Sequence, residues 1–360
     1  MSKNSDPQSS LVELMLEFVR AAVLDRVPII SQDVDIDWDK LQDISATQGL
    51  LAWVWDGICK LPIESQPPRR QRINWGLSAQ EIWDNYAHFK DVLCRMIKKC
   101  DENKIRLLLF KGIAQSELYV KPESRPAGDI DIYLFDDYER GNELFAHENV
   151  SRTNKRTGFD YDGVHIENHR NFLNASTKLH IKAIHFLNST LCDVRRSEDG
   201  YYVMSPISSI VYQVMHYLSH MDDYDSMVSI RNIVDFGISL LYYEKYIEPK
   251  RLRIVLDRLQ LLDLFCLLTL MSERVLELEF PIYHYKAISI KDQQSMFQLI
   301  LSRQNDIAPL TNRRPFEIIS FFIKRCNQYQ RLIKYLPQSR IKFVVSNYHS
   351  MINILLERHR

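Results

Sequence analysis

The spacing of apolar residues changes at Ile105, and this change constrains the fold of the chain most. Before it, residues 11–60 and 73–100 carry apolar residues at helical spacing. From Ile105 to Phe110 the chain then forms a short apolar run, IRLLLF, that ends at Lys111 and Gly112. A run of this length closed by glycine is typical of a buried strand. The sequence therefore predicts a helical N-terminal region followed by a separate module.

The residues after this run alternate between helix and strand patterns. We predict helices at residues 112–119 and 137–147, a strand at 129–135, and two further strands at 164–169 and 178–186. From Ser205 and Pro206, which resemble a helix N-cap and first turn, helical periodicity continues to the C-terminus. This pattern predicts three blocks: an N-terminal helical region at 1–103, a small α/β core at 104–204, and a C-terminal helical region with a basic tail at 205–360.

Composition narrows the fold class. Glycine accounts for only 10 of 360 residues, which disfavours the turn-rich β-sandwiches and barrels. The mixture of 46% hydrophobic and 26% charged residues excludes disordered and collagen-like chains. We therefore expect an α+β fold that is mostly helical, with a small mixed sheet.

Several features favour the cytoplasm and argue against a membrane. The 6 cysteines include no CxxC pair, so neither a disulfide framework nor a zinc ribbon is indicated. The N-terminus shows no apolar core of a secretion signal. The longest apolar segment, residues 261–271, is about half the length that spans a bilayer, and it contains Asp263.

Asp129 and Asp131 are the strongest candidates for chemistry. Side chains two residues apart on a strand point to the same face, so both carboxylates can converge on one cation while Ile130 packs into the core. Mg²⁺ is commonly bound by one or two carboxylates together with substrate phosphates. Glu167, in a neighbouring predicted strand, is the candidate for a third carboxylate, which would complete a two-metal site.

The turn at Lys111 and Gly112 is a candidate phosphate site. Glycine lets the backbone approach a phosphate closely, the helix that follows offers its N-terminus, and Lys111 adds a positive charge. Arg125 lies four residues before Asp129, where it could bind a phosphate or one of the carboxylates.

At these positions the chain resembles an uncharacterised bacterial nucleotidyltransferase family of the polymerase-β-like superfamily, whose pattern is roughly LKGxAL, LYP, R and DIDLLV. The similar segments are LFKGIA at 109–114, Leu118 with Tyr119, Arg125, and DIDI at 129–132. The similarity continues at ENH (167–169), at MHYLSH (215–220) and at RNIVD (231–235). The resemblance implies that Asp129, Asp131 and Glu167 bind metal, and it places Lys111 and Gly112 at the phosphate turn. The superfamily at large has Gly-Ser where this chain has Lys-Gly.

The predicted activity is transfer of a nucleoside monophosphate from a nucleoside triphosphate to a hydroxyl group, with release of pyrophosphate. The expected cofactor is Mg²⁺ or Mn²⁺, and ATP is the expected nucleotide. The acceptor is left open among small molecules, glycans, proteins and RNA. The residues assigned to this reaction are the catalytic and metal-binding Asp129, Asp131 and Glu167, and the nucleotide-binding Lys111, Gly112, Arg125 and His169.

Other histidines and acidic residues allow competing interpretations. His165, Glu167 and His169 alternate on one strand face, which is also a ligand set for iron or zinc. A second Asp-Ile-Asp, at residues 35–37, precedes a helical pattern and is interpreted as structural. Helix packing is the interpretation for His216 with His220, and an ordinary ion pair within one helix is the interpretation for Arg231 with Asp235.

The charge of the chain is unevenly distributed. Residues 311–360 contain ten Lys or Arg against two acidic residues, a formal charge of +8, while the first 310 residues carry −8. Aromatic residues are interleaved in this basic tail, an arrangement that suits RNA as well as a solvated helix. A toxin-like enzyme that modifies tRNA and a non-catalytic binding protein of the same fold therefore stay open as alternatives.

Overall fold

A computed structural model of the chain describes residues 7–30, 35–175, 177–222, 228–302 and 335. These residues divide into two compact units. The first unit extends to Tyr212 and also includes Ile238–Tyr246, and the second contains Gln213–Gly237 and the described residues from Ile247 onward. No helix within the described ranges has the length and apolar character needed to cross a membrane.

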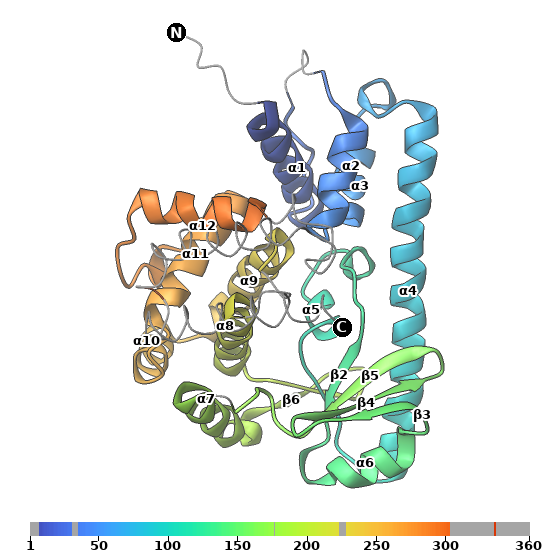
Figure 1. Ribbon diagram of the computed structural model, residues 1–360, viewed down its shortest axis with the longest axis vertical. Helices are drawn as coiled ribbons and strands as arrows, with labels where there is room; N and C mark the ends of the chain where they lie inside the picture. Colours follow the sequence, from blue (N-terminus) through green and yellow to red (C-terminus); the bar gives the residue numbers. More distant parts are fainter. Residues whose placement is uncertain (1–6, 31–34, 176, 223–227, 303–334, 336–360) are drawn as a thin grey trace, which may run out of the picture. The chain divides into compact units, whose positions relative to one another are not determined.

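The described chain is mostly helical, with one mixed sheet, and this confirms the predicted α+β class (Figure 1). Short helical turns connect several of the main elements. The helices are α1 (Pro7–Val23), α2 (Trp38–Thr47), α3 (Leu51–Cys59), α4 (Arg69–Glu102), α5 (Ile113–Ser116), α6 (Tyr138–Phe145), α7 (Lys178–Ser189), α8 (Pro206–Asp222), α9 (Ile230–Tyr243), α10 (Pro249–Arg258), α11 (Leu262–Leu276) and α12 (Ile290–Ser302). The strands are β1 (Leu108–Leu109), β2 (Ile130–Tyr133), β3 (Glu148–Arg152), β4 (Arg156–Tyr161), β5 (Val164–His169), β6 (Arg195–Arg196) and β7 (Tyr202–Val203).

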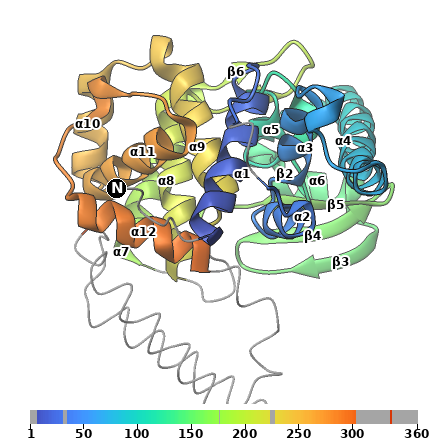
Figure 2. The same cartoon turned by 90° about the horizontal axis from the view of Figure 1, so that it is seen from above.

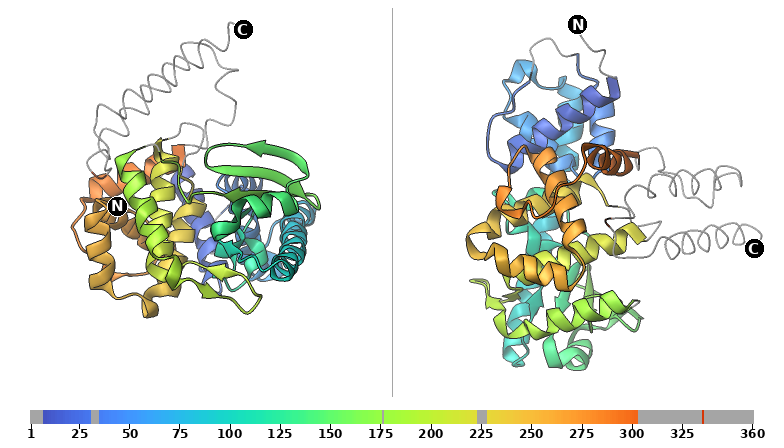
Figure 3. Two further views of the ribbon diagram at one scale, coloured as in Figure 1. Left: turned by 90° about the horizontal axis from the view of Figure 1, so that it is seen from below. Right: turned by 90° about the vertical axis from the view of Figure 1, so that its left-hand side faces the viewer.

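The sheet belongs to the first unit and has the strand order β3-β4-β5-β2-β1-β7-β6. Strands β2 and β5 are parallel neighbours, whereas β1 pairs with β2 and β4 with β5 in the antiparallel sense. The hairpin of β3 and β4 forms one edge of the sheet (Figure 3). Strand β2 therefore lies between β5 and β1, in the middle of the sheet, where its side chains can be buried.

One face of this sheet packs against α4, the longest helix among the described residues. Apolar residues of its C-terminal half, among them Val92 and Met96, join Ile130, Ile132 and Ile166 in a single buried cluster. Because side chains alternate along a strand, burial of these isoleucines turns Asp131 and Glu167 to the opposite face.

The N-terminal helices hold the loop that leads into β2. Lys121 Nζ lies 2.5 Å from Asp56 Oδ1, and the Ser124 hydroxyl donates to the other oxygen of that carboxylate. Trp83 of α4 donates its indole N–H to Ser124 Oγ at 2.9 Å. The loop before the acidic strand is thus fixed to α3 and α4 by a polar network.

The core differs from the sequence-based expectations at residues 178–186, in the hairpin of β3 and β4, and in the short pair of β6 and β7, which was not predicted. Residues 178–186 form part of helix α7, so the predicted strand is wrong. Thr177 caps this helix by accepting from the His180 N–H at 3.1 Å. The buried residues then recur at helical spacing, at His180, Ala183, Ile184 and Leu187.

The second difference is the hairpin of β3 and β4, which the sequence analysis did not predict. All five residues of β3 are exposed, so its sequence lacks the apolar alternation that marks a strand. The turn is stabilised by Thr153, whose N–H donates to Arg156 O at 2.9 Å and whose Oγ1 accepts from the Arg156 N–H at 3.1 Å. This hairpin places Lys155 in its turn and Arg156 at the start of β4.

The second unit is built from helices. Helices α10, α11 and α12 are successive neighbours in it (Figure 2). Gly237 of α9 allows close packing, because a Cβ there would lie 2.5 Å from Leu276 Cδ1. Ser272 of α11 donates to Ile233 O of α9 at 2.9 Å. The basic tail at 311–360, for which an RNA contact and a solvated helix were both left open, lies outside the described residues except for Tyr335.

Candidate active site

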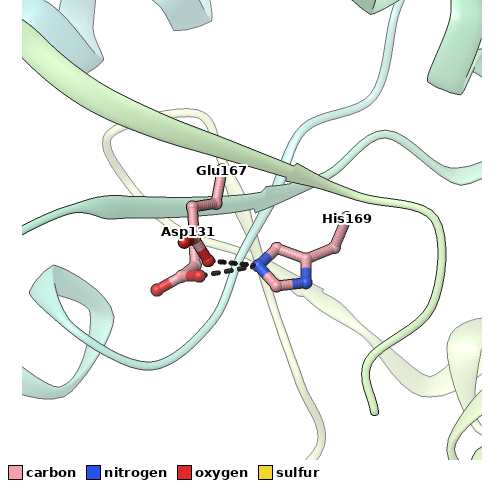
Figure 4. Close-up of side chains that lie close together, drawn as sticks. All are labelled: Asp131, Glu167 and His169. Carbon is pink, nitrogen blue, oxygen red and sulfur yellow. Dashed lines mark hydrogen bonds and ion pairs between the residues drawn. The ribbon is translucent and has the colours of Figure 1, made fainter. Parts of the chain in front are cut away.

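The register of two parallel strands brings together the central carboxylates of the site. Asp131 of β2 pairs directly with Glu167 of β5. Two residues further along β5, His169 lies on the same face as Glu167. Figure 4 shows the three side chains converging, with His169 facing both carboxylates.

These three residues form a buried cluster. His169 Nε2 lies 2.7 Å from Asp131 Oδ1 and 3.2 Å from Glu167 Oε2. One ligand atom from each of the three residues lies within 4.8 Å of the others. Asp131 is 1% exposed, Glu167 is 5% exposed and His169 is fully buried. Two carboxylates buried this deeply require positive charge nearby.

Lys111 and Arg156 supply that charge. Lys111 Nζ lies 2.5 Å from Asp131 Oδ1 and 3.7 Å from Glu167 Oε2. On the other side, an Arg156 guanidinium nitrogen lies 2.9 Å from Glu167 Oε1. Lys111 comes from the turn after β1, and Arg156 begins β4, opposite His169 in the pairing with β5. Four segments of the chain thus meet at the carboxylates.

The same neighbours set the protonation of the aspartates. Burial alone would raise the pKa of Asp131, but Lys111 and the hydrogen bond from His169 outweigh burial and hold that pKa well below its ordinary value. For Asp129, burial and the negative charge of Asp131 raise the pKa. Burial disfavours the charged form of Lys111, yet Asp131 raises the pKa of its ammonium above the usual range. Asp131 is therefore an anion, and Lys111 is its cationic partner.

The residues present fit a divalent cation. Asp131 Oδ2 is buried and has no hydrogen-bond partner in the described part of the chain. At Gly112, with φ of +47°, a Cβ would lie 3.3 Å from Asp129 O and 3.9 Å from Asp131 Oδ2. Glycine therefore leaves the space beside this oxygen open. Carboxylate oxygens suit Mg²⁺ and Mn²⁺, and an imidazole nitrogen suits Mn²⁺ and other transition metals.

The predicted site residues differ in how closely they contact this cluster. Lys111 and His169 each contact the carboxylates of Asp131 and Glu167. Asp129 precedes β2, is partly exposed, and lies outside the group of three potential metal ligands, although it is close enough to Asp131 and Lys111 to affect their charges.

Arg125 connects the two loops of the site. Its buried guanidinium donates to Gly112 O at 2.9 Å and to Gln115 Oε1 at 3.1 Å. It therefore fixes the turn at Lys111 and Gly112 relative to the loop before β2. Helix α5 after this turn is only four residues long, so the helix-terminus contribution expected from the sequence is small.

The histidines outside the cluster have other partners. His165 is exposed, and its Nδ1 lies 2.8 Å from Asp160 Oδ1. The ligand group found within the described ranges therefore contains one histidine and two carboxylates, and His165 is not part of it. On α8, His216 Nε2 lies 2.9 Å from His220 Nε2.

Three residues at the site were missed by the sequence analysis: Lys155, Arg156 and Tyr212. Lys155, in the hairpin turn, is half-buried, and burial together with the charges of Lys111 and Arg156 lowers its pKa to about 8. Tyr212 is buried against Phe110, with ring centroids 5.4 Å apart, and burial raises its pKa. A Lys-Arg pair in a hairpin turn would have been the signal for the first two, but the sequence pattern gives none for Tyr212.

No curated protein and no solved structure matches the chain significantly. A protein family described as uncharacterised nucleotidyltransferase matches residues 34–277, which is more than half of the chain and includes every residue of the cluster. The chain belongs to this uncharacterised nucleotidyltransferase family.

Proposed function

We propose that the protein is a metal-dependent nucleotidyltransferase that moves a nucleoside monophosphate from a nucleoside triphosphate to an acceptor hydroxyl. The observation that carries this proposal is the pairing of Asp131 with Glu167 on adjacent parallel strands, with one buried oxygen of Asp131 left without a partner in the described residues. Membership of a nucleotidyltransferase family supports the reaction type.

In this proposal Asp131 and Glu167 hold one or two Mg²⁺ or Mn²⁺ ions, with Asp129 and His169 beside them. When bound, such ions would neutralise the triphosphate and stabilise the attacking and leaving oxygens of an in-line displacement. ATP is the expected donor.

The cations of the chain orient the triphosphate. Lys111, at the turn before Gly112, binds its phosphates, and Arg125 keeps that turn in place through Gly112 O. The acceptor oxygen forms a bond to the α-phosphorus while the bond to the pyrophosphate oxygen breaks. The proton of the acceptor hydroxyl passes to Glu167 or to solvent, and pyrophosphate leaves.

The test uses the full chain with each of four α-³²P-labelled nucleoside triphosphates and Mg²⁺ or Mn²⁺. Small-molecule, glycan, protein and RNA fractions of a cell extract serve as acceptors, and pyrophosphate release and label transfer are measured. We expect metal-dependent transfer that Asp129→Asn with Asp131→Asn abolishes and Asp35→Asn with Asp37→Asn leaves intact.

Unchanged transfer in the 129/131 double variant would refute the proposal. Binding of metal and nucleotide without turnover on any fraction would instead favour the non-catalytic alternative.

A further inference from the structure

Two positively polarised groups share the same pair of carboxylate oxygens. Lys111 Nζ and His169 Nε2 both contact Asp131 Oδ1, at 2.5 and 2.7 Å, and both lie near Glu167 Oε2, at 3.7 and 3.2 Å. Metal ions bind carboxylate oxygens at about 2.0–2.6 Å. The Lys111 ammonium therefore lies at the distance from Asp131 Oδ1 that a bound ion would take.

Lys111 is a resident cation on Asp131 Oδ1, whereas Asp131 Oδ2 is open. We infer that a divalent ion bound by both Asp131 and Glu167 must displace Lys111 from Oδ1, and that the displaced ammonium then binds the triphosphate, so that metal and triphosphate enter the site together. This inference rests on the proposed function. It adds that the divalent ion binds weakly without the triphosphate, and the triphosphate weakly without the ion.

The turn that carries Lys111 is suited to such an exchange. Lys111 and Gly112 have consecutive positive φ values, +53° and +47°, which sets the turn apart from the strand before it. The lysine has a flexible four-carbon chain, and its side chain remains 16% exposed. Because Arg125 holds Gly112 O, the backbone can stay in place while the side chain moves.

The charges of the site favour coupled binding. Three carboxylates, Asp129, Asp131 and Glu167, are close to three cations, Lys111, Lys155 and Arg156, so their formal charges cancel. A divalent ion on its own would leave two positive charges uncompensated in a largely buried place, which is unfavourable. A triphosphate supplies the missing negative charge.

Lys155 provides an internal comparison for Lys111. Both side chains are close to Asp131 and Glu167, but in the described part of the chain Lys155 has no carboxylate within ion-pair distance. Removing Lys155 changes the charge of the site by the same amount without vacating Asp131 Oδ1. Comparing variants of the two lysines therefore distinguishes displacement of Lys111 from a general effect of positive charge on metal affinity.

The experiment measures the affinity for Mn²⁺ alone by calorimetry, using the full chain and its Lys111→Met and Lys155→Met variants. We expect Lys111→Met to bind Mn²⁺ at least about tenfold more tightly than the wild type, and Lys155→Met to differ by less than about threefold. The preformed complex of Mn²⁺ with inorganic tripolyphosphate is then titrated. Both variants should bind it at least about tenfold more weakly, because each has lost a cation.

The inference is overturned if Lys111→Met binds Mn²⁺ no more tightly than the wild type, or if Lys155→Met tightens binding equally. Lys111→Gln, which keeps a polar side chain without the charge, replaces Lys111→Met should the latter fail to fold, and it carries the same expectation. Failure of the proposed function is a different result, in which neither the wild type nor any variant binds Mn²⁺ or its tripolyphosphate complex.

Discussion

The tripeptide Asp-Ile-Asp occurs twice in this chain, at residues 35–37 and 129–131, and the two copies have different environments. In the first copy both aspartates are exposed, and Asp37 caps helix α2 by accepting from the Lys40 N–H at 3.0 Å. In the second copy Asp131 is 1% exposed and contacts Lys111 and His169. The family match covers residues 34–277, so family membership alone does not distinguish the two copies.

The difference teaches that the neighbouring strand, and not the spacing of the two aspartates, defines the site. An exposed carboxylate at a helix start is solvated and stabilised by the backbone N–H groups. A buried carboxylate on a central strand must be compensated by cations. At Asp131 the sheet supplies a second carboxylate directly opposite, in Glu167, and this pair is what a divalent ion could bind.

Removing the opposite carboxylate is the strongest way to test this comparison. We expect Glu167→Gln to lower the turnover number for nucleotidyl transfer at least about 100-fold, because it removes a charge that helps to neutralise the reacting centre. The amide keeps the shape of the side chain, so the fold should persist. Pyrophosphate release measures the effect.

Asp39→Asn is the matched control, because Asp39 is an exposed carboxylate two residues after the first copy that accepts from Gln71. Its turnover should equal that of the wild type. Full activity in Glu167→Gln would mean that Asp131 works without its partner across the sheet.

The main elements of the fold could be predicted from local patterns in the sequence. The helical periodicity of residues 73–100 and the apolar run from Ile105 correspond to α4 and to the strand region of β1. Residues 178–186 were mistaken for a strand because His180 and charged residues obscure a helical pattern that becomes clear once burial is known. The hairpin of β3 and β4 is held by its pairing with β5 and by turn hydrogen bonds, neither of which leaves an apolar pattern.

The candidate site divides in the same way. Asp131 and Glu167 are identifiable as carboxylates within predicted strands, and Lys111 as a cation in the turn after one. The structure places Lys111 Nζ beside both carboxylates. Asp131, and not Asp129, joins Glu167 and His169 in the group of potential metal ligands. This depends on the register between β2 and β5, which no local sequence pattern encodes. The division of the chain into three blocks, with boundaries at residues 103 and 204, stays a prediction.

A second prediction concerns Lys155, a partly buried lysine near the Asp-Ile-Asp at 129–131. Its pKa of about 8 lies below the usual value because burial, Lys111 and Arg156 all disfavour the charged form. Lys155 is therefore mostly charged at pH 7 and loses its proton as the pH rises through 8. With Mg²⁺ saturating, the affinity for tripolyphosphate should fall roughly five- to tenfold between about pH 7 and 9.5, since one phosphate-binding charge is lost.

Tripolyphosphate itself titrates in this range, so the comparison with Lys155→Met isolates the lysine. That variant should bind weakly at pH 7 and show only the pH dependence of the ligand. Parallel pH profiles for the wild type and Lys155→Met would show that Lys155 does not contact the phosphates.

The smallest expected effect belongs to the first copy. Asp37→Ala removes the side-chain oxygen that accepts from Lys40 N, and loss of such a cap costs about 1 kcal/mol of the free energy of unfolding. Asp37→Asn keeps an oxygen at this position and should retain most of that stability, which thermal denaturation of the two variants measures. Neither variant should change the affinity for Mn²⁺, because Asp37 is a solvated helix cap without a buried cationic partner in the described structure. If Asp37→Asn weakened Mn²⁺ binding as much as Asp131→Asn, both copies would be metal ligands, and burial between paired strands would no longer explain why one Asp-Ile-Asp differs from the other.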